Sequence, residues 1–372
     1  MNLSINYEIV DENKWKECIK EFPDAHFLQT SLWAAVKREN GWMPFYLLWK
    51  DTQGNTLAGV MILERTEKFI NFISVKVHYC PKGPLFITKN QEIITGVLNG
   101  LQAFSKQRNG LFIKIDPDFV TNVQADEIGD YSFLNFDPDL PQLLKSNHWV
   151  ESKEQIQFRN TIIIPLEKSD DQLMKEMKQK TRYNIRLSQR KGVETRIGNS
   201  TDMEKLFQLY AETALRDGFV IRSKKYYLNL WNKFYEAGLA EPIIAELDGE
   251  ILAAVIIYYF SGKAYYVYGM SSDKNRNLMA TYLLQWKAIQ RAREKGCKIY
   301  DFWGAPDELK ESDRMWGVYK FKLGFGGFFI KTIGAWDYPT RKLGYSFYHF
   351  VLPKLLGVMR KIGFRRTQKE LE

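Results

Sequence analysis

Apolar and polar residues along the chain predict two similar β-hairpins. The first joins residues 45–51 to residues 57–63, and the second joins residues 242–248 to residues 251–258. In both, short β-branched and aromatic runs flank a glycine-containing turn, which is typical of a hairpin. An aspartate stands directly before each turn. The shared plan indicates a duplicated folding unit.

Helical patterns precede and follow each hairpin. Residues 33–38 precede the first, and an apolar series with the spacing i, i+3, i+4, i+7, i+11 precedes the second: Met203, Leu206, Phe207, Tyr210 and Ala214. The spacing places these side chains on one face of a helix. After each hairpin we expect a helix and then a strand, in the ranges 93–106, 110–116, 279–295 and 296–302. This order predicts an α/β fold with mixed sheets flanked by helices.

The length of 372 residues favours two domains, at roughly 100 to 200 residues for each. Pro165 and the polar residues that follow it mark a boundary, after which a helix is expected over residues 171–190. We therefore expect a first subdomain at 1–165, a second at 166–340 and a basic, amphipathic tail at 341–372.

Composition narrows the class of protein. The hydrophobic fraction of 45% and charged fraction of 26% are ordinary for a globular protein and argue against disorder or a membrane bundle. The formal net charge of +9 favours anionic partners such as RNA, nucleotide diphosphates or lipid surfaces, without choosing among them.

Cysteine usage and the first residues favour a reducing location. Cys18, Cys80 and Cys297 are far apart and form no metal-binding spacing, so neither a disulfide framework nor a metal site is expected. Residues 1–13 lack the basic and apolar stretches of a secretory signal. The prediction is a cytoplasmic protein.

The C-terminal tail leaves two interpretations open. Residues 345–359 are aromatic and apolar, and four cations follow: Arg360, Lys361, Arg365 and Arg366. The stretch is shorter than the roughly 20 apolar residues of a transmembrane helix. It fits either a helix at the inner surface of the plasma membrane or a helix packed on the protein with a solvated basic end.

Five motifs occur in order along the chain: residues 27–37 (FLQTSLWAAVK), 180–193 (KTRYNIRLSQRKGV), 266–272 (YVYGMSS), 300–304 (YDFWG) and 318–327 (VYKFKLGFGG). Together they resemble the FemABX family of peptidoglycan bridge aminoacyltransferases over residues 27–336. The resemblance implies two acetyltransferase-like subdomains of the GNAT (acyl-CoA N-acyltransferase) type. Only a few residues separate Phe234 from Glu241, where many members insert a coiled-coil arm, so the chain is similar to the armless, FemX-like branch.

The same resemblance implies an activity and its partners. The chain would transfer Gly, Ala or Ser from aminoacyl-tRNA to the stem-peptide amine of a peptidoglycan precursor, either lipid II or UDP-MurNAc-pentapeptide. The ester of the donor supplies the activation, so no cofactor and no metal are expected, and the protein is expected to be a monomer.

Two residues are candidates for the chemistry through this resemblance. Lys322 matches the family's Phe-Lys pair, where a cation would stabilise the oxyanion or a nearby phosphate. Asp116 matches a family aspartate that would orient the attacking amine or accept its proton. From the residues alone, Lys322 also fits a solvated edge, and Asp116 before a proline also fits ordinary turn chemistry.

Six further residues are candidates for substrate binding: Lys37, Arg222, Tyr226, Tyr266, Tyr268 and Phe321. Lys37, Arg222 and Tyr226 match positions that grip the diphosphate and sugar of the precursor. Phe321 is a candidate support for the terminal adenosine. Tyr266 and Tyr268 are expected to point the same way from one strand, because side chains alternate with period two.

A basic helix is a candidate contact for the tRNA phosphates, although most charge runs are solvated faces. Its cations are Lys175, Lys178, Lys180, Arg182, Arg186, Arg190 and Lys191.

Two alternative functions remain open at this stage. The first is an acyl-CoA-dependent N-acyltransferase acting on a sugar or polysaccharide precursor. Leu278 counts against it, because the acetyltransferase fold normally has a glycine there to let phosphate approach the backbone. The second is a noncatalytic scaffold at the membrane surface.

Overall fold

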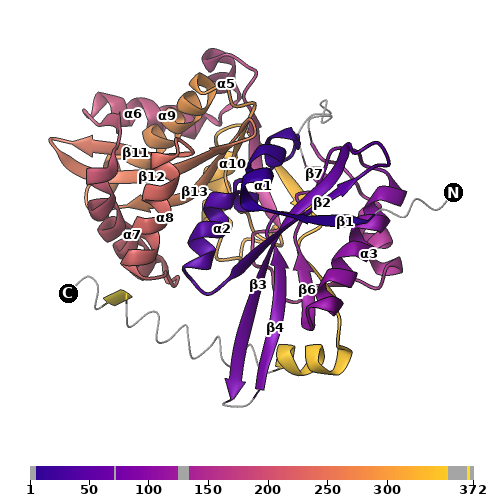
Figure 1. Cartoon of the computed structure of the whole chain (residues 1–372). Coiled ribbons are helices and arrows are strands. Elements are labelled where there is room, and N and C mark those ends of the chain that lie inside the picture. The colour runs from indigo at the N-terminus through magenta and orange to yellow at the C-terminus, as the bar shows by residue number, and fades with distance from the viewer. Residues whose placement is uncertain (1–5, 71–72, 125–133, 351–366, 369–372) are drawn as a thin grey trace. The chain divides into compact units, whose positions relative to one another are not determined.

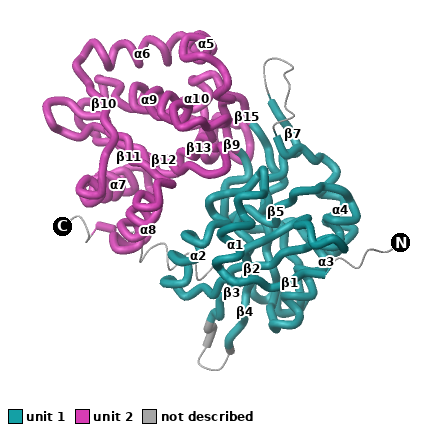
Figure 2. The backbone as a smooth tube through the Cα atoms, turned by 45° about the horizontal axis from the view of Figure 1, so that its top comes forward, with its two compact units in different colours: residues 1–160, 330–351 teal, residues 161–329, 352–372 magenta. Residues whose placement is uncertain are grey.

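The computed structural model describes residues 6–70, 73–124, 134–350 and 367–368. The chain forms two compact units, coloured separately in Figure 2: residues 1–160 with 330–351, and residues 161–329 with 352–372. Each contains one mixed sheet with helices against it (Figure 1), as the predicted fold class requires.

The first unit is built around a sheet with the strand order β1-β2-β3-β4-β6-β16-β8. Strands β4 and β6 are parallel, and their connection is the helix α3. The strands are β1 (Tyr7–Val10), β2 (Met43–Lys50), β3 (Thr56–Ile70), β4 (Ile73–Cys80), β5 (Leu85–Phe86), β6 (Gly110–Ile115), β7 (Val120–Gln124), β8 (Val150–Glu151) and β16 (Trp336–Pro339). The helices are α1 (Glu12–Cys18), α2 (Ser31–Arg38), α3 (Gln91–Gln107) and α4 (Leu140–Ser146).

The second unit repeats this plan with the strand order β10-β11-β12-β13-β14-β9-β15. Its strands are β9 (Asn160–Pro165), β10 (Glu194–Ile197), β11 (Ala240–Leu247), β12 (Glu250–Phe260), β13 (Lys263–Ser271), β14 (Ile299–Asp301) and β15 (Phe328–Thr332). Its helices are α5 (Asp170–Glu176), α6 (Gln179–Arg190), α7 (Met203–Asp217), α8 (Lys224–Glu236), α9 (Ala280–Glu294) and α10 (Trp316–Leu323).

The two halves correspond element by element. Hairpin β2/β3 matches hairpin β11/β12, and α3 connects parallel strands as α9 connects β13 to β14. The helical spacing predicted between Met203 and Ala214 is realised in α7, whose Leu206, Phe207 and Ala214 are buried. In the second unit α6 and α9 lie over one face of the sheet and α7 and α8 over the other (Figure 1).

One predicted helix is broken. The range 171–190 forms α5 and α6, because Met177 and Lys178 take extended ψ angles of 148° and 145°. The break buries the Met177 side chain in the core, and the Lys178 N–H donates to the Gly324 carbonyl at 2.9 Å. Neither proline nor glycine marks this break in the sequence, so the uninterrupted helix was wrong.

The chain returns to the first unit at its end. Strand β16 inserts between β6 and β8, and the buried Asp337 of β16 forms an ion pair with the buried Lys114 of β6 at 2.9 Å. Residues 342–350 are helical. Residues 351–366 and 369–372 of the predicted tail lie outside the described residues. Among the described residues, no helix has the length and apolar character to cross a membrane.

Candidate active site

Lys322 occupies a buried position in the second unit. It lies in α10 and is 4% exposed. Its Nζ donates to the Gly304 carbonyl at 2.6 Å and to the Trp303 carbonyl at 3.3 Å, and it lies 5.7 Å from the centroid of the Tyr266 ring. The structure therefore places Lys322 in the interior and not on a solvated edge.

Burial changes the protonation chemistry of this lysine. Removal from water lowers the pKa of Lys322 to about 7, and the negative charge of Asp301 acts in the opposite direction. An amine with this pKa is divided between ammonium and neutral forms near neutral pH. Such a group can stabilise developing negative charge or pass a proton.

Tyr266 and Tyr268 lie on opposite faces of the second sheet, which corrects the prediction that they point the same way. Strand β13 contains a bulge: Tyr268 pairs with Ile256, whereas Tyr266 pairs with Ile257, so Val267 is the extra residue. An added residue reverses the alternation of side chains. Tyr266 faces the core under α9, and Tyr268 faces α7 and α8.

The ring of Tyr266 requires a glycine two residues past the bulge. A Cβ built on Gly269 would lie 2.0 Å from the Tyr266 hydroxyl oxygen, a distance at which side-chain atoms cannot coexist. The missing side chain therefore leaves the space in which the Tyr266 ring lies beside Lys322. Burial raises the pKa of Tyr266 to about 12, so its hydroxyl stays protonated at neutral pH.

Tyr268 belongs to a second cluster, in which aromatic rings from α7, α8 and β12 meet edge to face. Its ring contacts Tyr210, Tyr227, Trp231 and Tyr258 at centroid distances of 5.6 to 6.1 Å. Tyr268 and these four rings form one packed aromatic cluster, the aromatic wall of this unit.

Arg222 and Tyr226 lie at the start of α8. Arg222 precedes the helix and is exposed, so the two do not share a helical face as a simple four-residue spacing suggests. Their contact is made across the helix cap: the Arg222 guanidinium lies 4.8 Å from the centroid of the Tyr226 ring, and Ser223 caps the helix through the Tyr226 N–H. A guanidinium presented on an aromatic ring is well suited to a phosphate or carboxylate.

Phe321 packs inside the second unit. Its ring lies 5.0 Å from Tyr282 and 5.3 Å from Phe325, between α9 and the end of α10. These ring contacts explain why position 321 is aromatic: its side chain packs against the hydrophobic core of the unit. The support of an adenosine by this ring stays a prediction.

Asp116 anchors a loop of the first unit. It is 3% exposed; its Oδ2 accepts the Tyr79 hydroxyl at 2.6 Å, and its Oδ1 accepts the Lys82 N–H at 2.5 Å. Burial raises the pKa of Asp116 to about 6, against the lowering effect of Lys82. Lys82 has a positive φ of 50°, and its Nζ pairs with Asp118 at 3.3 Å. The carboxylate therefore fixes the backbone at residue 82, and its catalytic role stays a prediction.

Lys37 lies near the end of α2, in the first unit. Its Nζ lies 4.4 Å from the centroid of the Trp33 ring, one turn earlier in the helix. The ring restrains the long side chain while the ammonium stays half-buried. This arrangement is compatible with the predicted grip on a diphosphate.

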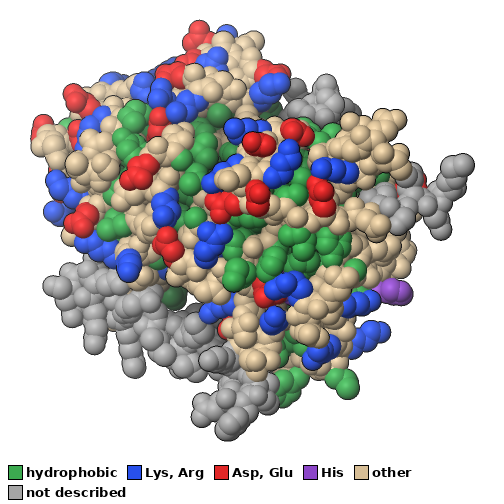
Figure 3. All heavy atoms as spheres, in the orientation of Figure 1, with side chains coloured by type: hydrophobic (Ala, Val, Ile, Leu, Met, Phe, Trp, Pro, Cys, Tyr) green, Lys and Arg blue, Asp and Glu red, His purple; other side chains and the backbone are tan. Residues whose placement is uncertain are grey.

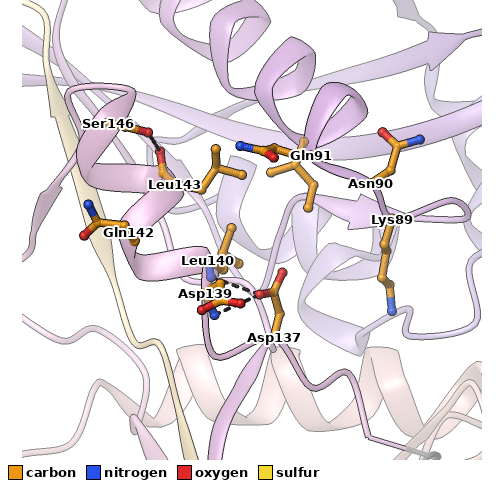
Figure 4. Close-up of a pocket in the computed structure, with 10 residues that line it drawn as sticks. Lys89, Asn90, Gln91, Asp137, Asp139, Leu140, Gln142, Leu143 and Ser146 are labelled. Carbon is orange, nitrogen blue, oxygen red and sulfur yellow. Dashed lines mark hydrogen bonds between the residues drawn. The ribbon is translucent and has the colours of Figure 1, made fainter.

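A separate cavity of about 470 Å³ opens between α3 and α4 of the first unit (Figure 4). Three of its polar side chains already have structural roles. Asp137 accepts the N–H groups of Asp139 and Leu140, Ser146 donates to the Leu143 carbonyl, and Lys89 pairs with Asp24. The cavity offers no group comparable with Lys322.

Sequence reasoning missed three residues around Lys322: Thr161, Asp301 and Trp303. Two of them stand in the motif at 300–304, which was noted without a role, but Thr161 lies far away in sequence. Among the described residues, no group of three His, Cys, Asp or Glu side chains is arranged for a metal. Leu278, at the position of the usual phosphate-loop glycine, is buried in the core.

The motif order, the duplicated sheets and the buried lysine agree with one family. The FemAB family profile matches residues 10–250 and 236–352. The chain belongs to the FemAB family. This membership confirms the recognition made from the five motifs.

Curated relatives of this FemAB chain carry enzyme names. It is 23% identical to the lipid II:glycine glycyltransferase of Staphylococcus epidermidis, over 93% of this chain and 95% of the relative. It is 22% identical to the lipid II:glycine glycyltransferase of Staphylococcus aureus, over 94% and 97%. These names are those of aminoacyltransferases, and they support the prediction of an enzyme over that of a scaffold.

Solved structures show the same fold. The crystal structure of FemX aligns with a TM-score of 0.77 and 21% identity, covering 93% of this chain and 100% of that one. A tandem GNAT protein of the clavulanic acid pathway aligns with a TM-score of 0.52 and 8% identity, covering 90% and 98%. The predicted architecture of two GNAT-like subdomains is confirmed.

Proposed function

We propose that this protein is a tRNA-dependent aminoacyltransferase that adds glycine, or the small residues Ala or Ser, to the stem-peptide amine of lipid II. The nucleotide-linked precursor UDP-MurNAc-pentapeptide is the second acceptor to compare. The observation that carries the proposal is the buried Lys322, in a chain of the FemAB family whose curated relatives are lipid II:glycine glycyltransferases.

The reaction needs little beyond positioning and charge stabilisation. The neutral amine of the acceptor attacks the ester carbonyl of the aminoacyl-tRNA, so a C–N bond forms and the C–O bond to the ribose breaks. The proton lost by the amine ends on the ribose hydroxyl. In the tetrahedral intermediate the carbonyl oxygen is negative, and the Lys322 ammonium would donate a hydrogen bond to it.

The acceptor would be held by the cation and ring pairs described above. Arg222 on Tyr226 offers a fork for the diphosphate, and Lys37 on Trp33 offers a point charge. Tyr268 forms part of the aromatic wall, Tyr266 lies beside Lys322, and Asp116 keeps its proposed role of orienting the amine.

The exposed face of α6 is the proposed contact for the tRNA backbone. Lys178, Lys180, Arg186 and Arg190 are exposed, and none of them forms an ion pair with any part of the chain that the structure describes. Tyr183, which is 55% exposed, lies among them. Elsewhere, on the face shown in Figure 3, cations and carboxylates are interspersed. Unpaired cations beside an exposed aromatic ring suit a phosphate chain.

The helical residues 342–350 are the proposed membrane contact. Leu343, Phe347 and Phe350 are 90%, 64% and 67% exposed and recur at i, i+4 and i+7, while Tyr348 is buried against Phe112. An apolar stripe with Arg341 and Lys342 at its start fits an anionic lipid surface. We place the protein in the cytoplasm, as a monomer, in contact with the inner face of the membrane that holds lipid II.

The decisive experiment is a transfer assay with defined substrates. Radiolabelled Gly, Ala and Ser on tRNA are offered to lipid II and to UDP-MurNAc-pentapeptide, with wild-type protein and Lys322→Met. We expect transfer to lipid II that depends on the tRNA and is lost in the variant. An active control enzyme transferring under the same conditions, with none by this protein, would overturn the proposal.

Two binding measurements test the surfaces separately. The double variant Arg186→Ala, Arg190→Ala should weaken tRNA binding. It should also reduce the slope of the logarithm of the binding constant against the logarithm of salt concentration, by up to ~0.9 for each lost phosphate contact. The matched control is the double variant Lys14→Ala, Lys16→Ala, on α1. Phe347→Ser should reduce sedimentation with phosphatidylglycerol vesicles and leave transfer to the water-soluble precursor unchanged. Equal vesicle binding by wild type and variant would remove the membrane contact from the proposal.

A further inference from the structure

The turn that follows β14 has an unusual backbone. Trp303 has a φ of 52° and Gly304 a φ of 107°. A left-handed conformation is ordinary for glycine but strained for a residue with a bulky side chain. A tryptophan stays in this conformation only where neighbouring groups hold it.

Asp301 and Thr161 hold this turn from two strands. The Asp301 Oδ1 accepts the Trp303 N–H at 2.8 Å and the Thr161 hydroxyl at 2.5 Å. The Thr161 hydroxyl in turn accepts the Gly304 N–H at 3.2 Å. Thr161 is on β9, which pairs with β14 in antiparallel register. Both N–H groups of the turn are thereby fixed on one side.

Fixing the N–H groups directs the two carbonyls toward Lys322. The Gly304 and Trp303 oxygens lie 2.6 and 3.3 Å from the Lys322 Nζ. An ammonium has three N–H donors and no acceptor. Among the described residues these two carbonyls satisfy two of the donors, so one donor remains, and its direction is set by the other two.

We propose that Thr161 and Asp301 are positioning residues for the transfer reaction: by clamping the 303–304 turn they orient the Lys322 ammonium so that its third N–H is aimed at the reacting carbonyl. This inference rests on the proposed function of Lys322. It assigns a role to a threonine outside every motif seen in the sequence.

The clamp also acts on the charge of Lys322. Carbonyl oxygens stabilise the ammonium form, and the carboxylate of Asp301 raises the pKa of Lys322 while burial lowers it. Asp301, from β14, is the charged group that acts on Lys322 within the described residues, and Tyr266, from β13, contributes its neutral ring. Loosening the clamp is therefore expected to favour the neutral amine.

The first test observes Lys322 without any substrate. Protein carrying ¹³Cε-labelled lysine is titrated by NMR, and the Lys322 signal is assigned by its loss in Lys322→Met. Thr161→Val removes the hydroxyl and keeps the shape, so the Lys322 pKa should fall. The matched control is Thr213→Val, in which a buried hydroxyl that also donates and accepts is removed from α7; there the Lys322 titration should be unchanged.

The second test separates the charge from the clamp. Asp301→Asn keeps an oxygen that can accept the Trp303 N–H but removes the negative charge, so it too should lower the Lys322 pKa. Activity that requires the ammonium falls as pH rises through this pKa. The alkaline limb of the kcat profile should therefore move to lower pH in both variants.

The third test is a double-mutant cycle in the transfer assay. Thr161→Val should lower kcat by about tenfold, comparable to one ordinary hydrogen bond, with KM unchanged. In the Lys322→Met background it should have no further effect, because a positioning residue acts through the group it positions.

Two outcomes overturn the inference. The first is an unchanged Lys322 titration in folded Thr161→Val, and the second is an equal loss of activity with and without Lys322. Both would give Thr161 a merely structural role. Because the NMR titration needs no transfer, a wild-type protein that titrates as expected but transfers nothing would instead contradict the proposed function.

Discussion

Lys322 in the second unit and Asp116 in the first are both buried ionisable groups whose pKa values move toward neutrality, yet their surroundings differ in one respect. Both oxygens of Asp116 already accept hydrogen bonds, from Tyr79 and from the backbone of Lys82. Within the part of the chain that the structure describes, Lys322 uses two of its three donors, on the carbonyls of Trp303 and Gly304. The spare donor of Lys322 is available for substrate chemistry, whereas both hydrogen bonds of Asp116 anchor a loop, and only its remaining lone pairs could orient the amine.

The largest effect should come from Lys322→Met. We expect turnover to fall by roughly 10² to 10³-fold, which is typical of removing an oxyanion-stabilising donor. The fold should persist, because a buried ammonium is replaced by an apolar side chain of similar length. Single-turnover transfer measures the first and circular dichroism the second. Wild-type turnover in the variant would reduce Lys322 to a structural lysine like any other.

Asp116→Asn comes second and tests the anchor. The amide has one acceptor oxygen where the carboxylate has two, so either the Lys82 N–H or the Tyr79 hydroxyl loses its acceptor, and the free energy of unfolding should fall by about 1 to 3 kcal/mol. Urea denaturation measures this loss. Asp118→Asn, at the half-buried partner of the Lys82 Nζ, is the control with a smaller expected loss. Unchanged stability with abolished transfer would make Asp116 the base after all.

Gly269→Ala should have a smaller effect on stability and a selective one on activity. The new Cβ would meet the Tyr266 hydroxyl and displace its ring from beside Lys322, costing about 1 kcal/mol, at the low end for overpacking. Thermal unfolding and kcat are the measurements. Gly317→Ala in α10, where the added Cβ meets nothing within 4 Å, is the matched control. Equal behaviour of the two variants would show that the ring position is immaterial.

A further prediction concerns how the free energy of unfolding depends on pH. The pKa of Lys322 is about 7 in the folded protein and near 10.5 in the unfolded chain, so the unfolded chain binds more protons between these values. The free energy of unfolding should therefore rise as pH increases from about 7 to about 10.5. Lys322→Met should lack this rise when the two proteins are compared by urea denaturation. If the free energies of unfolding of the two proteins changed with pH in parallel, a buried Lys322 with a lowered pKa would be contradicted.

Local pattern was sufficient for much of the fold. The helices around Leu98 and Ile289 and both hairpins follow from periodicity. Each helix buries one apolar face, and each hairpin buries the apolar side chains of its strands. The break after Glu176 could not be predicted, since the groups that stabilise it include the distant carbonyl of Gly324. The bulge at Val267 was equally invisible, and it reversed the expected direction of Tyr268 relative to Tyr266.

The candidate site was predicted in part, and only through family resemblance. The motifs identify Lys322, but no pattern in the sequence says that it is buried or which carbonyls it contacts. Those facts depend on Thr161, which meets Asp301 and Gly304 only after β9 and β14 have paired. A long-range clamp of this kind has no local signature.

Strand β16 has a consequence for how the protein is made. Its residues follow β9 to β15 of the second unit in the chain, yet Trp336 and Asp337 lie between β6 and β8 in a sheet whose other strands are synthesised first. On the ribosome, the edge of β6 stays open until residues 161–329 of the second unit have emerged. The first unit therefore cannot mature as an independent early domain, and a nascent chain stalled before residue 336 would expose a strand edge that chaperones or other edges can bind.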